Sequence, residues 1–176
     1  VERIIGHKND PGVDILTIAA KHSIETIFSE AVLNELKNIP DTVCENDLIG
    51  RTDLTKEMIF TIDGDDTKDI DDAISVKKDG NNYILGVHIA DVSNYAKVGT
   101  ALYDSAFSRG TSSYLADTVI PMLPHKLSNG ICSLNPEVVR LTISCVMTIN
   151  DAGKVIDYDI FPSYIKSRKQ MTYKNV

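Results

Sequence analysis

The sequence predicts an α+β domain built around a mainly antiparallel sheet with flanking helices. Residues 139–149 alternate between apolar and mostly polar side chains, which is the period of a long half-buried strand. Two more apolar runs, 73–77 and 83–90, are separated by a short polar turn, as in a β-hairpin. Helical spacing of apolar residues is confined to short stretches outside these runs. The strands therefore dominate the expected fold.

Three helices are expected, each with recognisable end residues. Good caps are short polar side chains at the start and glycine just past the end. The expected helices are 14–22 with Asp14 as its cap, 29–37 ending before Pro40, and 100–109 between the cap Thr100 and the stop Gly110.

The strands are expected in the order 58–62, 73–77, 83–90, 139–149 and 154–165. The strand over 83–90 is apolar on both faces, which is typical of a central position in a sheet. The turn over 150–153 joins the last two strands as a second hairpin. Residues 41–56 are expected to form an extended polar connector, and residues 111–137 to be irregular.

Composition restricts the class of protein. The 176 residues are enough for about one domain. A net charge of −7 argues against a broad basic footprint for nucleic acid, although an acidic metal site would account for part of that charge. No apolar run is long enough for a membrane span. Three widely spaced cysteines, Cys44, Cys132 and Cys145, indicate free thiols in a reducing, cytoplasmic compartment.

The most informative segment is an aspartate cluster between two apolar runs. Six of the ten residues 63–72 are aspartates, namely Asp63, Asp65, Asp66, Asp69, Asp71 and Asp72. Carboxylates this close repel one another unless a cation neutralises them. Hard divalent cations with oxygen ligands are the usual reason for such a cluster. A pair of metals about 3.5–4 Å apart is typical of enzymes that act on phosphate esters.

Other interpretations of this cluster remain open from the residues alone. An acidic surface loop would also be rich in aspartate and glycine. The run from Asp63 to Thr67 fits the D-x-D-x-T pattern of haloacid-dehalogenase-like phosphatases, with Asp63 as nucleophile and Asp65 as acid or base. That pattern requires a parallel, doubly wound domain, which the hairpins after residue 72 argue against. No register of the cluster fits an EF-hand loop.

Several longer motifs carry a resemblance to one family. Thr61-Ile-Asp63 followed by Lys68-Asp-Ile-Asp-Asp-Ala-Ile74 resembles the catalytic motif of the ribonuclease II/ribonuclease R family. Further blocks follow in the family's order and are closer to its ribonuclease R branch: His88–Ser93, Arg109–Gly110, Tyr114–Leu115, Val119–Pro124, Leu127–Gly130 and Cys132–Pro136.

The resemblance implies a hydrolytic, processive 3′-to-5′ exoribonuclease that releases nucleoside 5′-monophosphates. Its cofactor would be Mg²⁺, expected as two ions, with Mn²⁺ as a substitute and no other small-molecule cofactor. By position, Asp63, Asp69 and Asp72 match ligands of the catalytic magnesium, and Asp71 matches an aspartate needed for catalysis through a second metal. Tyr114 matches a tyrosine that packs against RNA. The expected partner is the 3′ end of single-stranded RNA, without a membrane.

The resemblance also implies a domain organisation. Residues 1–50 are expected to leave an upstream OB-type barrel and form a helical lead-in, and residues 51–176 to form the N-terminal part of an RNB-type catalytic domain. The family's catalytic arginine lies further along, so this piece by itself is expected to be inactive or nearly so, and any oligomer it forms to be uninformative. A catalytically degenerate RNA-binding module is a further alternative, which the intact aspartate quartet argues against.

Overall fold

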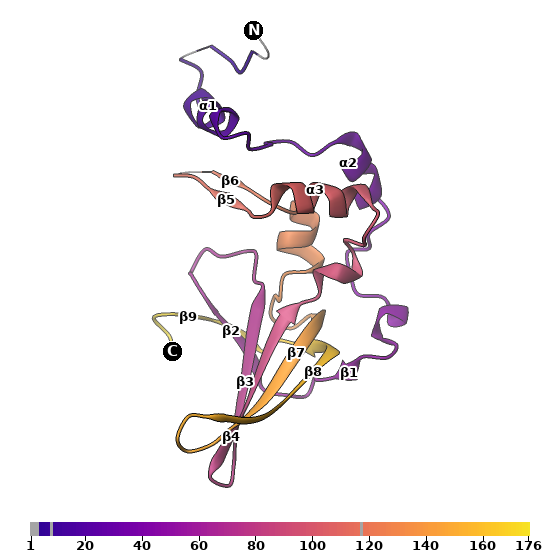
Figure 1. Cartoon of the computed structure of the whole chain (residues 1–176), viewed down its shortest axis with the longest axis vertical. Helices are drawn as coiled ribbons and strands as arrows, with labels where there is room; N and C mark the ends of the chain where they lie inside the picture. The colour runs from indigo at the N-terminus through magenta and orange to yellow at the C-terminus, as the bar shows by residue number, and fades with distance from the viewer. Residues whose placement is uncertain (1–3, 8, 117) are drawn as a thin grey trace. The chain divides into compact units, whose positions relative to one another are not determined.

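The computed structural model describes residues 4–7, 9–116 and 118–176 (Figure 1). The chain divides into two compact units, each made of two segments. The helical unit comprises Val1–Asn38 and Ala96–Pro124, and the sheet unit comprises Ile39–Tyr95 and His125–Val176. The domain boundary expected near residue 50 stays a prediction.

The helical unit contains three helices and a small hairpin within its described residues. These are α1 (Val13–Lys21), α2 (Glu30–Leu36), α3 (Ala101–Arg109) and the antiparallel pair β5 (Ser113–Tyr114) and β6 (Val119–Ile120). Thr100 caps α3 as predicted, and Ser29 caps α2 without having been predicted to; each side chain accepts a backbone hydrogen bond from the first turn of its helix. Among the described residues no helix is long and apolar enough to cross a membrane.

The predicted cap of α1 is wrong. The helix begins at Val13, and Gly12 precedes it in a left-handed conformation with φ of 80°. Asp14 therefore lies inside the first turn rather than at its start. Its negative charge still favours this end of the helix through the helix dipole.

Both ends of α3 are fixed to the segment that precedes it in sequence. The two carboxylate oxygens of Glu35 accept hydrogen bonds from the backbone N–H groups of Ala101 and Leu102, each at 2.8 Å. At the other end, the Arg109 guanidinium donates to the carbonyl of Ile27 at 2.8 Å and lies 4.2 Å from the centroid of the Phe28 ring. A carboxylate at the N-terminus and a cation at the C-terminus both complement the helix dipole.

The described part of the sheet unit contains one seven-stranded mixed sheet, in the order β1-β8-β7-β4-β3-β2-β9 (Figure 1). The strands are β1 (Thr52–Asp53), β2 (Ile59–Asp63), β3 (Asp72–Asp79), β4 (Asn82–Ala90), β7 (Val139–Ile149), β8 (Val155–Lys166) and β9 (Lys169–Thr172). The pairs from β2 through β3, β4 and β7 to β8 are antiparallel, and the outer pairs β1 with β8 and β2 with β9 are parallel. The α+β class is confirmed, and so is the central position of β4.

Two stretches are more regular than the sequence predicted. Residues 41–56 contain the 3₁₀ turn η1 (Glu45–Leu48) as well as β1. Residues 111–137 contain the β5–β6 hairpin and the π-helical turn η3 (Lys126–Ile131). A further 3₁₀ turn, η2 (Val92–Asn94), follows β4. Strands of two residues give too short an alternation to be recognised in a sequence.

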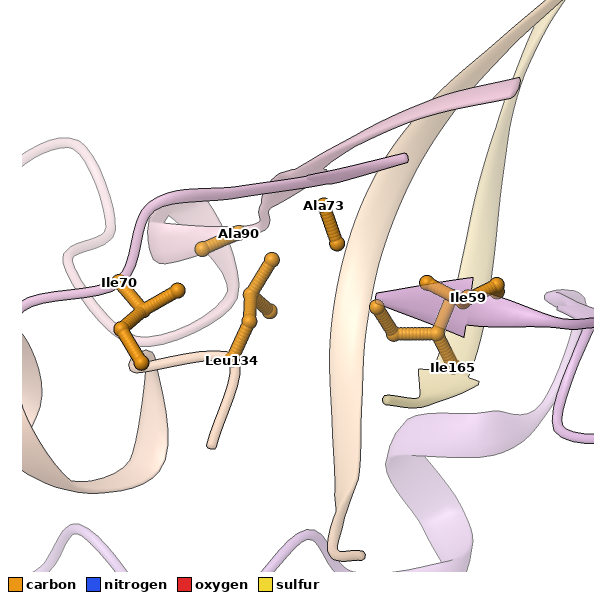
Figure 2. Packing of buried hydrophobic residues seen from close by; sticks show 6 residues of the cluster. All are labelled: Ile59, Ile70, Ala73, Ala90, Leu134 and Ile165. Carbon is orange, nitrogen blue, oxygen red and sulfur yellow. The ribbon is translucent and has the colours of Figure 1, made fainter. Parts of the chain in front are cut away.

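The hydrophobic core of the sheet unit reaches the aspartate segment. Its buried members are Ile59, Ile70, Ala73, Ala90, Leu134 and Ile165 (Figure 2). Ile70 and Leu134 are both fully buried, and Figure 2 shows their side chains beside each other. Ile70 lies between Asp69 and Asp71 in sequence, so the core anchors the loop that carries these carboxylates.

A row of buried polar side chains crosses the middle of the sheet. His88 on β4 contacts Ser75 of β3 through Nε2 at 3.1 Å and Ser144 of β7 through Nδ1 at 2.6 Å. Ser144 Oγ in turn lies 2.6 Å from Ser163 Oγ on β8. His88 is 1% exposed, so these hydroxyls replace the water it would otherwise bind.

Candidate functional site

The four predicted metal ligands lie around one end of the β2–β3 pair. Asp63 is the last residue of β2 and Asp72 is the first residue of β3, while Asp69 and Asp71 lie in the connection between them. The β2–β3 ladder extends only as far as the pair Phe60 and Ile74. Beyond that pair the two strands are no longer hydrogen-bonded to each other, and residues 64–71 connect their ends.

The carboxylates are close enough to influence one another. Burial is the largest cause that raises the pKa of Asp63, and the charges of Asp72 and Asp69 raise it further, while the nearby Thr61 hydroxyl lowers it. Asp71 keeps an exposed surface, yet the protein around its other sides raises its pKa by desolvation, and Asp69, Asp72 and Asp63 add to the rise. A bound cation would relieve this repulsion and favour the ionised carboxylates.

One carboxylate oxygen of the cluster lacks a hydrogen-bond donor among the described residues. Asp63 Oδ2 and the nearby Thr61 Oγ1 are both buried, and within the part of the chain that the structure describes neither is at hydrogen-bonding geometry to a partner. A buried acceptor without a donor is costly, and a cation can satisfy it. The oxygen-only donor set is also the one that Mg²⁺ prefers. The donor chemistry at this site therefore fits a divalent cation.

The carboxylates do not form a closed cage. Among the described residues, no group of three or more His, Cys, Asp or Glu side chains is arranged so that it could hold a metal ion. The four aspartates are close enough for their charges to raise the pKa values of Asp63 and Asp71, whereas their role as ligands stays a prediction. Asp65 pairs with Lys174 at 3.3 Å on the exposed surface, and Asp66 is exposed.

Sequence reasoning missed the residues that hold the loop between Asp63 and Asp72. The side chain of Gln170 on β9 donates to the carbonyl of Thr67 at 3.2 Å. The backbone N–H of Ala90 donates to the carbonyl of Asp71 at 2.9 Å. A third contact is made by Ser133, whose Oγ accepts a hydrogen bond from the backbone N–H of Ile70. In the sequence, only its place within the family block Cys132–Pro136 marked this serine.

Tyr114, the predicted RNA-binding residue, belongs to the other unit. It ends the short strand β5 of the helical unit, and 66% of its surface is exposed. An exposed aromatic ring on a hairpin is able to stack on a base. This exposure is compatible with the predicted role without testing it.

A comparison with protein families gives one match to this chain. The model described as the RNB domain matches residues 51–176. The chain belongs to the RNB family. All four aspartates and Tyr114 lie inside the RNB match.

Two RNB relatives match nearly the whole chain at high identity. Ribonuclease R of Thermotoga maritima is 53% identical over 179 residues, which cover 100% of this chain and 25% of that protein. The structure of Mycoplasma genitalium RNase R in complex with ribose methylated single-stranded RNA superposes with a TM-score of 0.92 at 30% identity, covering 99% of this chain and 27% of that one. The chain thus spans about a quarter of the length of these relatives.

The same RNB fold also occurs in a protein described as inactive. Yeast Ssd1, a pseudonuclease, superposes with a TM-score of 0.80 at 19% identity over 97% of this chain and 22% of that one. At this identity the likeness shows the fold alone. The fold by itself therefore does not decide between catalysis and binding, which depends on the residues at the site.

Proposed function

We propose that this chain supplies the metal-binding carboxylates of a metal-dependent 3′-to-5′ exoribonuclease. The enzyme would degrade RNA processively from the 3′ end of single strands and release nucleoside 5′-monophosphates in the cytoplasm. The observation that carries this proposal is the aspartate quartet, with the orphaned Asp63 Oδ2, in a chain of the RNB family. The similarity to ribonuclease R proteins, including one whose structure is of a complex with single-stranded RNA, supports RNA as the substrate.

Each aspartate has a separate task in this proposal. Asp63, Asp69 and Asp72 would hold one Mg²⁺, and Asp71 would act through a second. The bound ions would polarise the scissile phosphate and lower the pKa of water to make a nucleophile. Asp63 extends from a strand whose Ile59 is fully buried, so its backbone is held by the core. The exposed ring of Tyr114 would stack on a base, which contributes about 1–3 kcal/mol and tolerates any sequence.

The haloacid-dehalogenase interpretation of the same segment is not supported. It needs a parallel, doubly wound sheet, whereas this sheet is mixed: β2 is antiparallel to β3, the strand that follows it in sequence, and parallel only to the outer strand β9. It also leaves Asp69, Asp71 and Asp72 without a role.

The test uses the full-length protein, single-stranded RNA labelled at its 5′ end, and Mg²⁺. We expect the RNA to disappear into a short end product without a ladder of intermediates. Asp71→Asn should abolish this turnover, because it removes one of the mutually interacting carboxylates. Asp66→Asn is the matched control, since it removes an equal charge from an exposed position in the same loop.

Three results would contradict the proposal. Intact RNA with the unsubstituted protein but retained RNA binding would favour a degenerate binding module. Equal activity of the Asp71→Asn and Asp66→Asn variants would place the chemistry elsewhere. Robust, chelator-sensitive hydrolysis by residues 1–176 alone would contradict the expectation that this part is inactive by itself.

A further inference from the structure

The loop that carries Asp69 and Asp71 lies outside the hydrogen-bonded pairing of β2 with β3. The β2–β3 pairing ends at Phe60 and Ile74, so the backbone between Gly64 and Asp71 is held by contacts from elsewhere in the sheet unit. A loop with few fixed contacts samples several conformations, and each one points its carboxylates differently. The direction of these carboxylates therefore depends on whatever fixes the loop.

Ser133 fixes the backbone on both sides of Asp69. Its Oγ accepts a hydrogen bond from the backbone N–H of Ile70 at 3.1 Å and donates one to the carbonyl of Lys68 at 2.7 Å. One hydroxyl thus joins the residue before Asp69 to the residue after it. The next residue, Leu134, donates its backbone N–H to the carbonyl of Ile70 at 2.9 Å and adds a third bond.

Ser133 is itself held by Arg140 of β7. The Arg140 Nε donates to the carbonyl of Ser133 at 2.8 Å, and its Nη2 donates to the carbonyl of Gly130 at 3.1 Å. Arg140 is 8% exposed, so water has little access to these bonds. The guanidinium fork fixes two carbonyls of the segment in a single geometry. Through Arg140 and Ser133, the long strand β7 thus holds the aspartate loop in position.

Burial makes the hydroxyl hard to replace. Ser133 and Ile70 are both fully buried (0% exposed), so water cannot take over the bond between the Ser133 hydroxyl and the Ile70 N–H. Ile70, at one end of this contact, and Leu134, the residue after Ser133, belong to the same buried core cluster (Figure 2). Loss of the hydroxyl would leave the buried N–H of Ile70 without a partner and free the carbonyl of Lys68, and the loop would have to move to satisfy the N–H.

We propose that Ser133 is a positioning residue for the aspartate quartet, whose buried hydroxyl sets the direction in which Asp69 and Asp71 present their carboxylates to a divalent cation. Residues that orient metal ligands typically change metal affinity or activity by about 10–100-fold when they are removed. This inference rests on the proposed function only for its activity measurements. Its metal-binding consequence can be measured without RNA.

The experiment compares Ser133→Ala with Ser163→Ala in the full-length protein. Ser163 is also fully buried, and its Oγ is hydrogen-bonded to Thr142 and Ser144 within the sheet, so both variants lose a buried, bonded hydroxyl. The first measurement is the affinity for Mn²⁺ alone, from the loss of the free-ion EPR signal on binding. The second is kcat against Mg²⁺ concentration on single-stranded RNA. Ser133→Cys, which keeps a weaker donor and acceptor of similar size, is the conservative variant.

We expect Ser133→Ala to bind Mn²⁺ about tenfold or more weakly and to need correspondingly more Mg²⁺, with kcat recovering at saturating Mg²⁺. Ser133→Cys should fall between it and the unsubstituted protein, and it replaces Ser133→Ala if that variant does not fold. Ser163→Ala should bind Mn²⁺ as the unsubstituted protein does. Unchanged Mn²⁺ affinity in both Ser133 variants, or an equal loss in Ser163→Ala, would overturn the inference.

Failure of the proposed function gives a different pattern. If the unsubstituted protein binds Mn²⁺ but leaves RNA intact, the proposed activity is wrong while the effect of Ser133 on metal affinity still decides the inference. If the unsubstituted protein binds no Mn²⁺, both the metal site and the role of Ser133 are overturned.

Discussion

His88 should make the sheet unit lose stability as the pH falls. Its ring is 1% exposed and contacts the uncharged hydroxyls of Ser75 and Ser144. Burial lowers the pKa of His88 from 6.5 to about 4, and no charged side chain among the described residues contributes to that shift. The folded chain therefore keeps a neutral imidazole at pH values where the unfolded chain takes up a proton.

The sign and size of the effect follow from linkage. Between pH 6.5 and about 4 the unfolded state binds more protons at this residue, so stability is fully present above pH 6.5 and falls as the pH is lowered towards 4. The whole difference in pKa corresponds to about 3 kcal/mol, and about 2 kcal/mol of it should be lost between roughly pH 7.5 and pH 5.

The assay is urea unfolding of residues 1–176 at these two pH values, with and without His88→Asn. Carboxylates contribute to the pH dependence of both proteins, so the difference between the two slopes isolates His88. Asn cannot titrate and should flatten the dependence by about 2 kcal/mol, even though its own stability is lower. An identical pH dependence in both proteins, or a His88 ring NMR signal that titrates near pH 6.5, would refute the reasoning.

Two further predictions concern the packing of each unit. Gly86→Ala should destabilise the sheet unit by about 1–3 kcal/mol, because a Cβ at this position would lie 2.8 Å from His88 Nε2 and closer still to Ser75 Oγ; a urea midpoint equal to that of the unsubstituted chain would contradict this. Glu35→Gln should weaken the start of α3 by about 1 kcal/mol, because it removes the charge from an acceptor of two backbone N–H groups. Hydrogen exchange of the amides of Ala101 and Leu102 measures this weakening. Glu30→Gln on α2 is the control and should leave the exchange of these two amides unchanged.

The sequence was sufficient to predict those elements that depend on interactions between residues close together in the chain. The hairpin of β3 and β4, the cap Thr100 and the stop at Gly110 depend on local patterns, and all were predicted. The positions of Asp63 at the end of one strand and Asp72 at the start of the next also followed from the sequence pattern. Local pattern failed at Gly12, where the left-handed backbone rather than the Asp14 side chain begins the helix.

What could not be predicted depends on pairing between distant segments. Strand β9 has only four residues and is defined by its parallel partner β2. The role of Ser133 depends on hydrogen bonds to Lys68 and Ile70, which lie far away in the sequence. No periodicity marks a single serine for such a contact, so only the folded chain reveals it.

The parallel pairing of β2 with β9 also determines the order in which the sheet can form. Phe60 pairs with Lys169, whereas the β3–β4 hairpin joins near neighbours in the chain. Contacts between distant residues form later, because a long loop must close first. During synthesis β2 leaves the ribosome well before β9, and its outer edge stays unpaired and prone to associate with other chains in that interval. The parallel ladder between β2 and β9, which includes Asp63, is therefore expected to be among the last parts of the sheet to form.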